Sequence, residues 1–273
     1  MFYKTLSILC IMTFCTSSFV SAADSSKKKS SKKEEADVGY AKPKHVSDAE
    51  WAAVKPYLLP ASHSLKNKLD RLFSKTRVIK NSETIKSAGF AQAEVRRWSH
   101  TVVTKHPKFK KYFFKLFTDE QTTIDGCKYL VKRAFGAASA RKTIEKYGLG
   151  KFFVVPKKWI YVLPENPAPA ASANRKNFIL VAERIDILSS HQNFSRWKSS
   201  KVKPKLLDAL YLLMKEEGLK DSIYPFNVPF TPSGKIALID LEHNHEWPVA
   251  FSVFEKFLSS EMKIYWMTLV NKK

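Results

Sequence analysis

The chain has 273 residues, 44% of them hydrophobic and 13% aromatic, and its formal net charge is +22 at pH 7. This composition excludes a disordered chain, which buries too little apolar surface to fold, and the length allows one substantial core or two smaller ones around a cleft. The positive charge favours phosphates, nucleic acid, anionic lipid or an acidic protein as partners, without ranking these four.

Residues 1–22 have the pattern of a secretory signal peptide. Lys4 supplies the positive start, residues 6–14 form an apolar run broken by Ser and Thr, and residues 20–22 (Val-Ser-Ala) form a cleavage site. An uncleaved anchor is the alternative, but the apolar run is shorter than the roughly 20 residues that span a bilayer. We therefore expect an exported protein, periplasmic or secreted, with no transmembrane span after signal cleavage.

Residues 23–45 are rich in Lys and Ser and have no apolar periodicity, which predicts a disordered linker. Residues 46–98 have helical patterns instead. The run from Ser47 to Glu50 is a capping box that starts a short helix. Apolar residues at helical spacing predict a second helix over 65–73, and a third is expected within 83–98. We expect this helical extension to pack against the strands that follow.

After residue 99 the pattern changes to β-rich runs separated by turn residues. Three of these runs predict an antiparallel meander of strands at 100–106, 112–117 and 129–134. A helix over 137–147 should end at Gly148, because glycine commonly ends helices. Further strands are expected at 152–155, 159–163 and 178–182. The fold class indicated is α+β.

The last third of the chain combines helices with a short hairpin. A helix over 202–217 ends at Gly218, and a closing helix is expected over 249–270. Between them, residues 227–230 and 235–239 predict two strands of a hairpin around a Pro-Ser-Gly turn. Asn227 and Asp240 lie thirteen residues apart, so the hairpin should bring them together at one end.

These features resemble the protein-kinase-like superfamily. The resemblance is carried by the element order, by Pro225-x-Asn227, and by the run Ile239-Asp240-Leu241-Glu242, which is similar to the Asp-x-Glu of aminoglycoside and choline kinases. It implies a kinase-like domain over 99–273, with an antiparallel five-stranded N-lobe and a reduced helical C-lobe, preceded by the helical extension.

The resemblance also implies roles for individual residues. Asn227 and Asp240 would hold Mg²⁺, as the corresponding Asn and Asp do in kinases. Lys132, assigned to the third strand, would grip the phosphates of ATP. Glu145 on the following helix would be the ion-pair partner of Lys132, and Glu183 would lie at the hinge that binds adenine.

Several departures from the kinase pattern predict impaired catalysis. Residues 100–119 contain no glycine, so a Gly-rich loop cannot cover the phosphates there. Ser222 stands where the catalytic acid is expected, and the nearest acid, Asp221, lies one residue earlier. A shift of one residue re-aims a general base that must approach its proton closely. Only 33 residues follow Asp240, too few for a full helical lobe.

The sequence therefore predicts a catalytically impaired pseudokinase that acts as a binding or regulatory module. Two alternatives stay open. One is an active atypical kinase that transfers phosphate from ATP-Mg with Asp221 as its base. The other is a basic, non-enzymatic effector that binds an anionic partner. The partner would be an acidic or phosphorylated protein or a nucleotide, and the oligomeric state is not indicated.

Two further patterns favour structural interpretations. His243 and His245 lie on one face of an extended segment and could bind a transition metal, but no third ligand at a recognisable spacing accompanies them. A polar loop is the preferred interpretation. Residues 105–112 interleave basic and aromatic side chains, as in some nucleic-acid-binding surfaces. A solvated basic hairpin is preferred there, so nucleic acid is not the expected partner.

Overall fold

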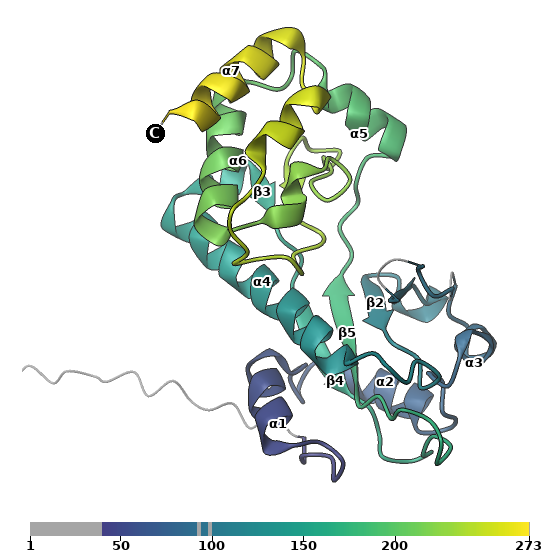
Figure 1. Cartoon of the computed structure of the whole chain (residues 1–273). Coiled ribbons are helices and arrows are strands. Elements are labelled where there is room, and N and C mark those ends of the chain that lie inside the picture. The colour runs from purple at the N-terminus through teal and green to yellow at the C-terminus, as the bar shows by residue number, and fades with distance from the viewer. Residues whose placement is uncertain (1–39, 92–93, 98–99, 273) are drawn as a thin grey trace, which may run out of the picture. The chain divides into compact units, whose positions relative to one another are not determined.

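The computed structural model describes residues 40–91, 94–97 and 100–272. The fold is α+β, with a four-stranded antiparallel sheet in the order β1-β2-β5-β4 and a small parallel pair, β3 and β6 (Figure 1). The strands are β1 (Val102–Thr104), β2 (Tyr112–Leu116), β3 (Phe153–Val154), β4 (Lys158–Val162), β5 (Phe178–Glu183) and β6 (Ile236–Ala237). The α-helices are α1 (Asp48–Val54), α2 (Lys66–Phe73), α3 (Ser82–Ser87), α4 (Gly126–Lys146), α5 (Ser190–Trp197), α6 (Pro204–Glu217) and α7 (Ser260–Asn271).

The expected signal peptide, and the expected linker up to residue 39, lie outside the described residues. In the part of the chain that the structure describes, no helix has the length and apolar character needed to cross a bilayer.

The helical extension begins as the sequence predicts. The Oγ of Ser47 accepts a hydrogen bond from the Glu50 amide at 3.2 Å, and the Glu50 carboxylate accepts one from the Ser47 amide at 3.0 Å. This capping box satisfies amides that the first turn of α1 leaves unpaired. The helix predicted within 83–98 is shorter than expected, because α3 ends at Ser87 and Gly89 takes a left-handed φ of 91°.

The predicted meander is correct for its first two strands and wrong for the third. Strands β1 and β2 pair antiparallel, but residues 129–134 belong to α4, so the antiparallel sheet has four strands and not five. Leu130, Ala134 and Ala137 are buried at positions i, i+4 and i+7, which is the spacing of one helix face. Asp125 caps this helix through a 3.3 Å hydrogen bond from the Lys128 amide.

Helices cover both faces of the four-stranded sheet. Successive side chains on a strand point to opposite faces, so the strands contribute to a buried cluster on each side. On one face Phe114, Tyr161 and Val181 share a buried cluster with Leu69 of α2 and Ile85 of α3. The expected packing of the helical extension against the strands is thereby confirmed. On the other face a second cluster joins strand residues to helices α1 and α4, and its members include Val54, Leu130, Ala134, Ile160 and Leu180.

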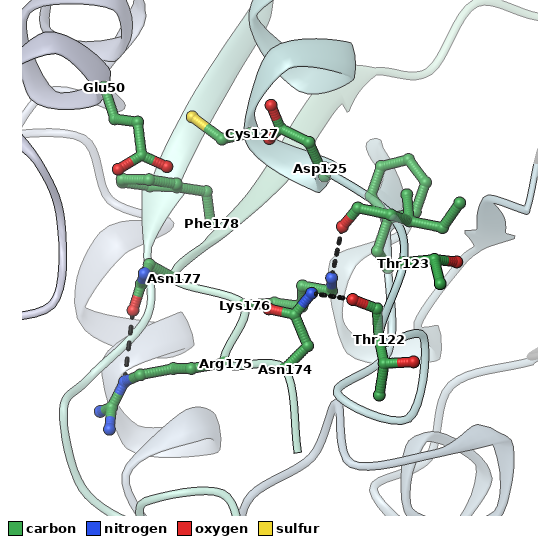
Figure 2. A pocket seen from close by; sticks show the side chains of 13 residues that line it. Glu50, Thr122, Thr123, Asp125, Cys127, Asn174, Arg175, Lys176, Asn177 and Phe178 are labelled. Atoms are coloured by element: carbon green, nitrogen blue, oxygen red, sulfur yellow. Dashed lines mark hydrogen bonds between the residues drawn. The ribbon is translucent and has the colours of Figure 1, made fainter. Parts of the chain in front are cut away.

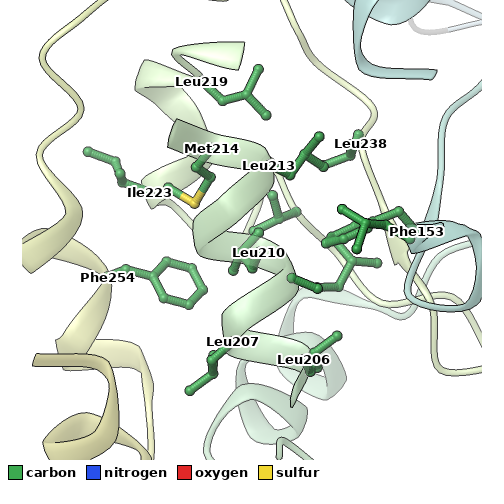
Figure 3. Packing of buried hydrophobic residues seen from close by; sticks show 14 of the residues in the cluster. Phe153, Leu206, Leu207, Leu210, Leu213, Met214, Leu219, Ile223, Leu238 and Phe254 are labelled. Carbon is green, nitrogen blue, oxygen red and sulfur yellow. The ribbon is translucent and has the colours of Figure 1, made fainter. Parts of the chain in front are cut away.

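The largest buried cluster surrounds α6. Figure 3 shows Leu210, Leu213 and Met214 of this helix among side chains from segments distant in sequence, including Phe153 of β3 and Phe254. The helix ends where predicted, at Gly218, whose φ is 56°. The predicted closing helix is divided into a 3-10 helix, η5 (Phe251–Phe257), and α7, which Ser259 caps.

The predicted hairpin around Pro232 is present in reduced form. The Thr231 amide donates to the Lys235 carbonyl at 2.8 Å, and Phe230 and Ile236 form a single antiparallel bridge. The returning strand, β6, pairs mainly with β3, in parallel orientation.

Helix α4 connects the two parts of the core. Figure 1 shows its first turns beside β4 and β5 and its last turns beside α6. Ala137, Ala140 and Ile144, in its second half, belong to the cluster around α6, whereas Leu130 and Ala134 belong to the cluster under the sheet. One helix is therefore buried against both.

Candidate functional site

The sheet presents two lysines to helix α4. Lys115 of β2 lies opposite Leu180 of β5, and Lys158 of β4 lies opposite Ala182 of the same strand. Leu180 and Ala182 are two residues apart, so their side chains share one face of the sheet. Lys115 and Lys158 consequently point to that face, and Arg133 of α4 approaches it from the helix.

Asp240 meets these cations from the segment after β6. The Nζ of Lys115 lies 2.9 Å from Oδ2 of Asp240, and Nε of Arg133 lies 3.5 Å from Oδ1. The Nη2 of Arg133 contacts the carboxylate of Glu242. We call these five residues, Lys115, Arg133, Lys158, Asp240 and Glu242, the charged cluster.

Several donors of the charged cluster are buried without a hydrogen-bond partner. Lys158 is 4% exposed and Arg133 is 2% exposed. Among the described residues, Nζ of Lys158 and Nη1 of Arg133 make no hydrogen bond. Nε of Arg133 and Oδ1 of Asp240 make none either, although they face each other at 3.5 Å as an ion pair. Such groups are rare in folded proteins, because a buried donor without an acceptor loses its hydrogen bonds to water and gains none in return. The side chain of Asp240 is 36% exposed, so the cluster reaches solvent on that side.

The electrostatics of the charged cluster favour an additional anion. Burial, followed by the nearby charge of Lys115, lowers the pKa of Lys158 to about 7. Burial also lowers the pKa of Lys115. Burial alone would raise the pKa of Asp240, but the positive charges of Lys115 and Arg133 prevail and hold it below its usual range. Burial raises the pKa of Glu242. Three basic side chains thus face two carboxylates, and a bound anion would raise the pKa of Lys158 and favour its charged form.

A close backbone approach positions the charged cluster. Gly136 of α4 lies so near the segment 241–244 that a Cβ there would overlap the Leu241 carbonyl and the Asn244 side chain. The Nδ2 of Asn244 donates to the Leu241 carbonyl at 2.8 Å and reaches the Lys132 carbonyl on α4 at 3.4 Å. These contacts hold Asp240 and Glu242 against the turn of α4 that carries Arg133.

The sequence prediction for Lys132 was wrong about its location. Lys132 lies on α4, not on a strand, and its Nζ pairs with Glu246 at 3.2 Å near the surface. Glu145 lies on the same helix and is exposed. Thirteen residues of helix separate the two by about 20 Å, so they cannot form the predicted ion pair. Lys115 is the strand lysine that contacts Asp240.

Asn227 and Asp240 have different partners. The Nδ2 of Asn227 donates to the Asp221 carbonyl at 2.9 Å, within the loop that follows the 3-10 helix η4 (Lys220–Ile223). The Asp221 carboxylate lies 3.6 Å from Nε2 of His243. The structure therefore brings Asn227 to Asp221, and it brings Asp240 to the cations of β2 and α4.

A magnesium site at Asn227 and Asp240 stays a prediction. Asp240 is paired with Lys115 and Arg133, whose positive charges oppose the approach of a metal ion. Across the described ranges, no group of three or more His, Cys, Asp or Glu side chains is placed to hold one. His243 and His245 also have separate partners, since Nδ1 of His243 lies 3.1 Å from Glu246 and Nε2 of His245 lies 3.5 Å from Glu217. The donors of the charged cluster suit phosphate oxygens instead.

Glu183 lies at the end of β5, beside a cavity of about 540 Å³. Its Oε2 accepts a hydrogen bond from the Lys157 amide at 3.0 Å. Tyr112, Val155 and Arg184 also line the cavity. A role for Glu183 in adenine binding stays a prediction.

A second cavity, of about 360 Å³, lies at the start of α4 (Figure 2). Two of its polar side chains, Lys176 and Asn174, have partners within the protein. The Nζ of Lys176 donates to the Gln121 carbonyl at 2.9 Å and to the Ile124 carbonyl at 2.6 Å. The Nδ2 of Asn174 donates to the Thr122 carbonyl at 2.7 Å. These contacts close the loop before α4, which is a structural role.

The functional residues predicted from the sequence do not include Lys115, Arg133 or Lys158. The sequence carries a signal for the first two. Lys115 is a charged residue inside the apolar strand Tyr112–Leu116, and Arg133 lies between Leu130 and Ala134 on the buried side of α4. A charge on a buried face requires a partner, and this pattern marks a candidate site.

Comparisons with known proteins add no relative to this picture. No protein-family model matches the chain. No curated protein matches it either. The charged cluster and the order of the elements around it are therefore the features that bear on function.

Proposed function

We propose that the protein is an exported, kinase-like binding protein with impaired catalysis, which holds a phosphate-bearing ligand such as a nucleotide at the charged cluster. The observation that carries this proposal is the burial of Lys158 and Arg133 with donors that lack acceptors. Phosphate oxygens are strong acceptors and carry the compensating charge.

The kinase-like part of the proposal is supported by the arrangement of elements. A strand lysine, Lys115, precedes the long helix α4, and it contacts the Asp of the Asp-x-Glu run that follows β6. Strands β4 and β5, and then helices α5 and α6, come between them in the chain. Lys115 thus takes the part that the resemblance assigned to Lys132.

The impaired catalysis is supported by the surroundings of the two acids. Asp240 is neutralised by Lys115 and Arg133, and Ser222, at the position expected for the catalytic acid, is buried. An active phosphotransferase is the second candidate, favoured by one observation. Asn227 holds the backbone of Asp221, whose carboxylate is partly exposed beside His243.

The test is a thermal-shift titration of the full chain with ATP, with and without Mg²⁺. A ligand at 100 times its dissociation constant adds about 2.7 kcal/mol of stability, which raises the melting temperature by several degrees. We expect this rise in the wild type and its loss in Lys158→Met. Lys132→Met is the matched control, because it removes a half-buried lysine of α4 that pairs with Glu246 outside the charged cluster, and it should keep the rise.

Two results would contradict the proposal. One is a wild type whose melting temperature ATP does not change. The other is a rise of equal size in Lys158→Met, which would place the ligand elsewhere. A transfer assay with γ-labelled ATP then separates the two candidates, since only the phosphotransferase releases or transfers label in an Asp221-dependent way.

A further inference from the structure

We infer that Asp240 acts as an internal competitor for the anionic ligand, so that the charged cluster binds phosphate as a free anion, without a divalent metal. This inference rests on the proposed function and adds to it the chemical form of the ligand. Removing the Asp240 carboxylate should therefore tighten ligand binding. At a metal-dependent site the same change would abolish binding.

The geometry of Asp240 is that of a bound anion. Each carboxylate oxygen faces a different cation, with Oδ2 2.9 Å from Lys115 and Oδ1 3.5 Å from Arg133. A phosphate group offers two oxygens to the same pair of donors. Carboxylate and phosphate would therefore compete for Lys115 and Arg133.

A divalent metal has no favourable place among these residues. The carboxylate that would bind it is covered by cations on both oxygens, and Lys158 lies buried close by. A divalent cation placed beside Lys115 and Arg133 would be repelled by both, and it would lower the pKa of Lys158 further. Arg133 already supplies, from the protein, the positive charge that a metal would otherwise bring to the phosphate.

The exchange requires movement of one side chain. Leu238 and Leu241 on either side of Asp240 are buried in the cluster around α6 and hold the backbone in place. The Asp240 side chain is itself partly exposed, and no helix or strand includes it. Rotation of its carboxylate towards solvent would free Lys115 and open the buried donors of Arg133 and Lys158 to a ligand.

The experiment is calorimetric titration of the full chain with inorganic tripolyphosphate in excess EDTA. Wild type should bind, and Asp240→Asn should bind at least about tenfold more tightly, because the competing charge is removed. Asp48→Asn is the matched control, since it makes the same change of net charge at an exposed carboxylate on α1. Its affinity should equal that of the wild type.

Glu242→Gln is a second variant in case Asp240→Asn does not fold. It removes the other carboxylate of the charged cluster, the one that contacts Arg133, and it should also tighten binding. The inference is overturned if wild type binds tripolyphosphate only with Mg²⁺ and Asp240→Asn loses that binding; the proposed function would then stand. If neither wild type nor any variant binds tripolyphosphate under either condition, the inference and the proposed function both fail.

Discussion

Lys115 of β2 and Asp240, 125 residues later in the chain, form an ion pair of 2.9 Å that joins the four-stranded sheet to the segment after β6. The lysine side chain is largely buried, and Arg133 of α4 contacts the same carboxylate. Breaking a buried pair by removing one partner strands the other charge, so these residues depend on one another for their stability.

The stability of the protein should rise with pH in the alkaline range because of Lys158. Its pKa is about 7 in the folded protein, below the value of an unfolded lysine. Between those two values the unfolded chain binds more protons than the native state, so the free energy of unfolding increases with pH. One such group contributes at most about 1.4 kcal/mol per pH unit. Urea unfolding at pH 7, 8 and 9 measures the slope.

Lys158→Met isolates this contribution. The variant should be at least as stable as the wild type at pH 7, since it replaces an uncompensated buried charge with an apolar side chain of similar length. Its advantage should shrink as the pH rises. Lys132→Met, at a half-buried position of α4, should keep the slope of the wild type. An identical slope in Lys158→Met would show that Lys158 is protonated throughout this range.

Gly136→Ala should destabilise the fold by about 1–3 kcal/mol, because the added methyl group overlaps the Leu241 carbonyl and the Asn244 side chain. The displaced segment carries Asp240 and Glu242, so binding at the charged cluster should weaken too. Gly150→Ala is the control, since nothing lies within 4 Å of its Cβ and its φ is ordinary. Urea unfolding of both variants measures the difference, and equal stabilities would contradict the close approach.

Two glycines with a left-handed backbone allow the cost of backbone strain to be compared with the cost of steric overlap. Gly148 and Gly218 have φ values of 63° and 56°. A Cβ at Gly148 meets nothing within 4 Å, so Gly148→Ala should cost only the left-handed strain of about 1–2 kcal/mol. A Cβ at Gly218 lies 2.7 Å from the Trp247 ring and 2.8 Å from the Glu246 amide nitrogen. Gly218→Ala should therefore be the more destabilising of the two in urea unfolding, and the reverse order would refute the contact with Trp247.

Asp119→Ala should destabilise the protein by about 3–5 kcal/mol. Asp119 is fully buried, and it accepts two 2.8 Å hydrogen bonds from Arg77 and one of 3.0 Å from the Lys176 amide. Removing the carboxylate leaves the Arg77 guanidinium with a buried, uncompensated charge. Asp186→Ala breaks an exposed pair with Arg184 and should change stability by less than about 1 kcal/mol. Thermal or urea unfolding of the two variants tests the contrast.

The sequence predicted those elements whose signals are local. The capping box at Ser47 and the glycine that ends α6 depend on a few neighbouring residues, and both were correct. The strand predicted at 129–134 failed because Leu130, Val131 and Ala134 suit a strand and a helix equally well over so short a run. The segment is helical because its apolar residues continue at helical spacing as far as Ile144.

The candidate site was harder to predict, because it depends on contacts between distant segments. Asp240 was identified from the Asp-x-Glu run, and the structure places it at the centre of the charged cluster. Lys132 was selected for its position in a misassigned strand, whereas Lys115 and Lys158 come together only through the pairing of β2 and β4 with β5. Sequence spacing alone carries no information about that register.

Helix α4 gives the protein a property that neither part of the core would have alone. Leu130 and Ala134 are buried beneath the sheet, and Ala137 and Ile144 are buried beside α6, within a single run of helical hydrogen bonds. Unfolding of either cluster would unfold α4 and so remove its side chains from the other cluster. Denaturation of the described region should therefore follow one cooperative transition. The fluorescence of Trp159, beside the sheet, and of Trp197, in the cluster around α6, should report the same midpoint.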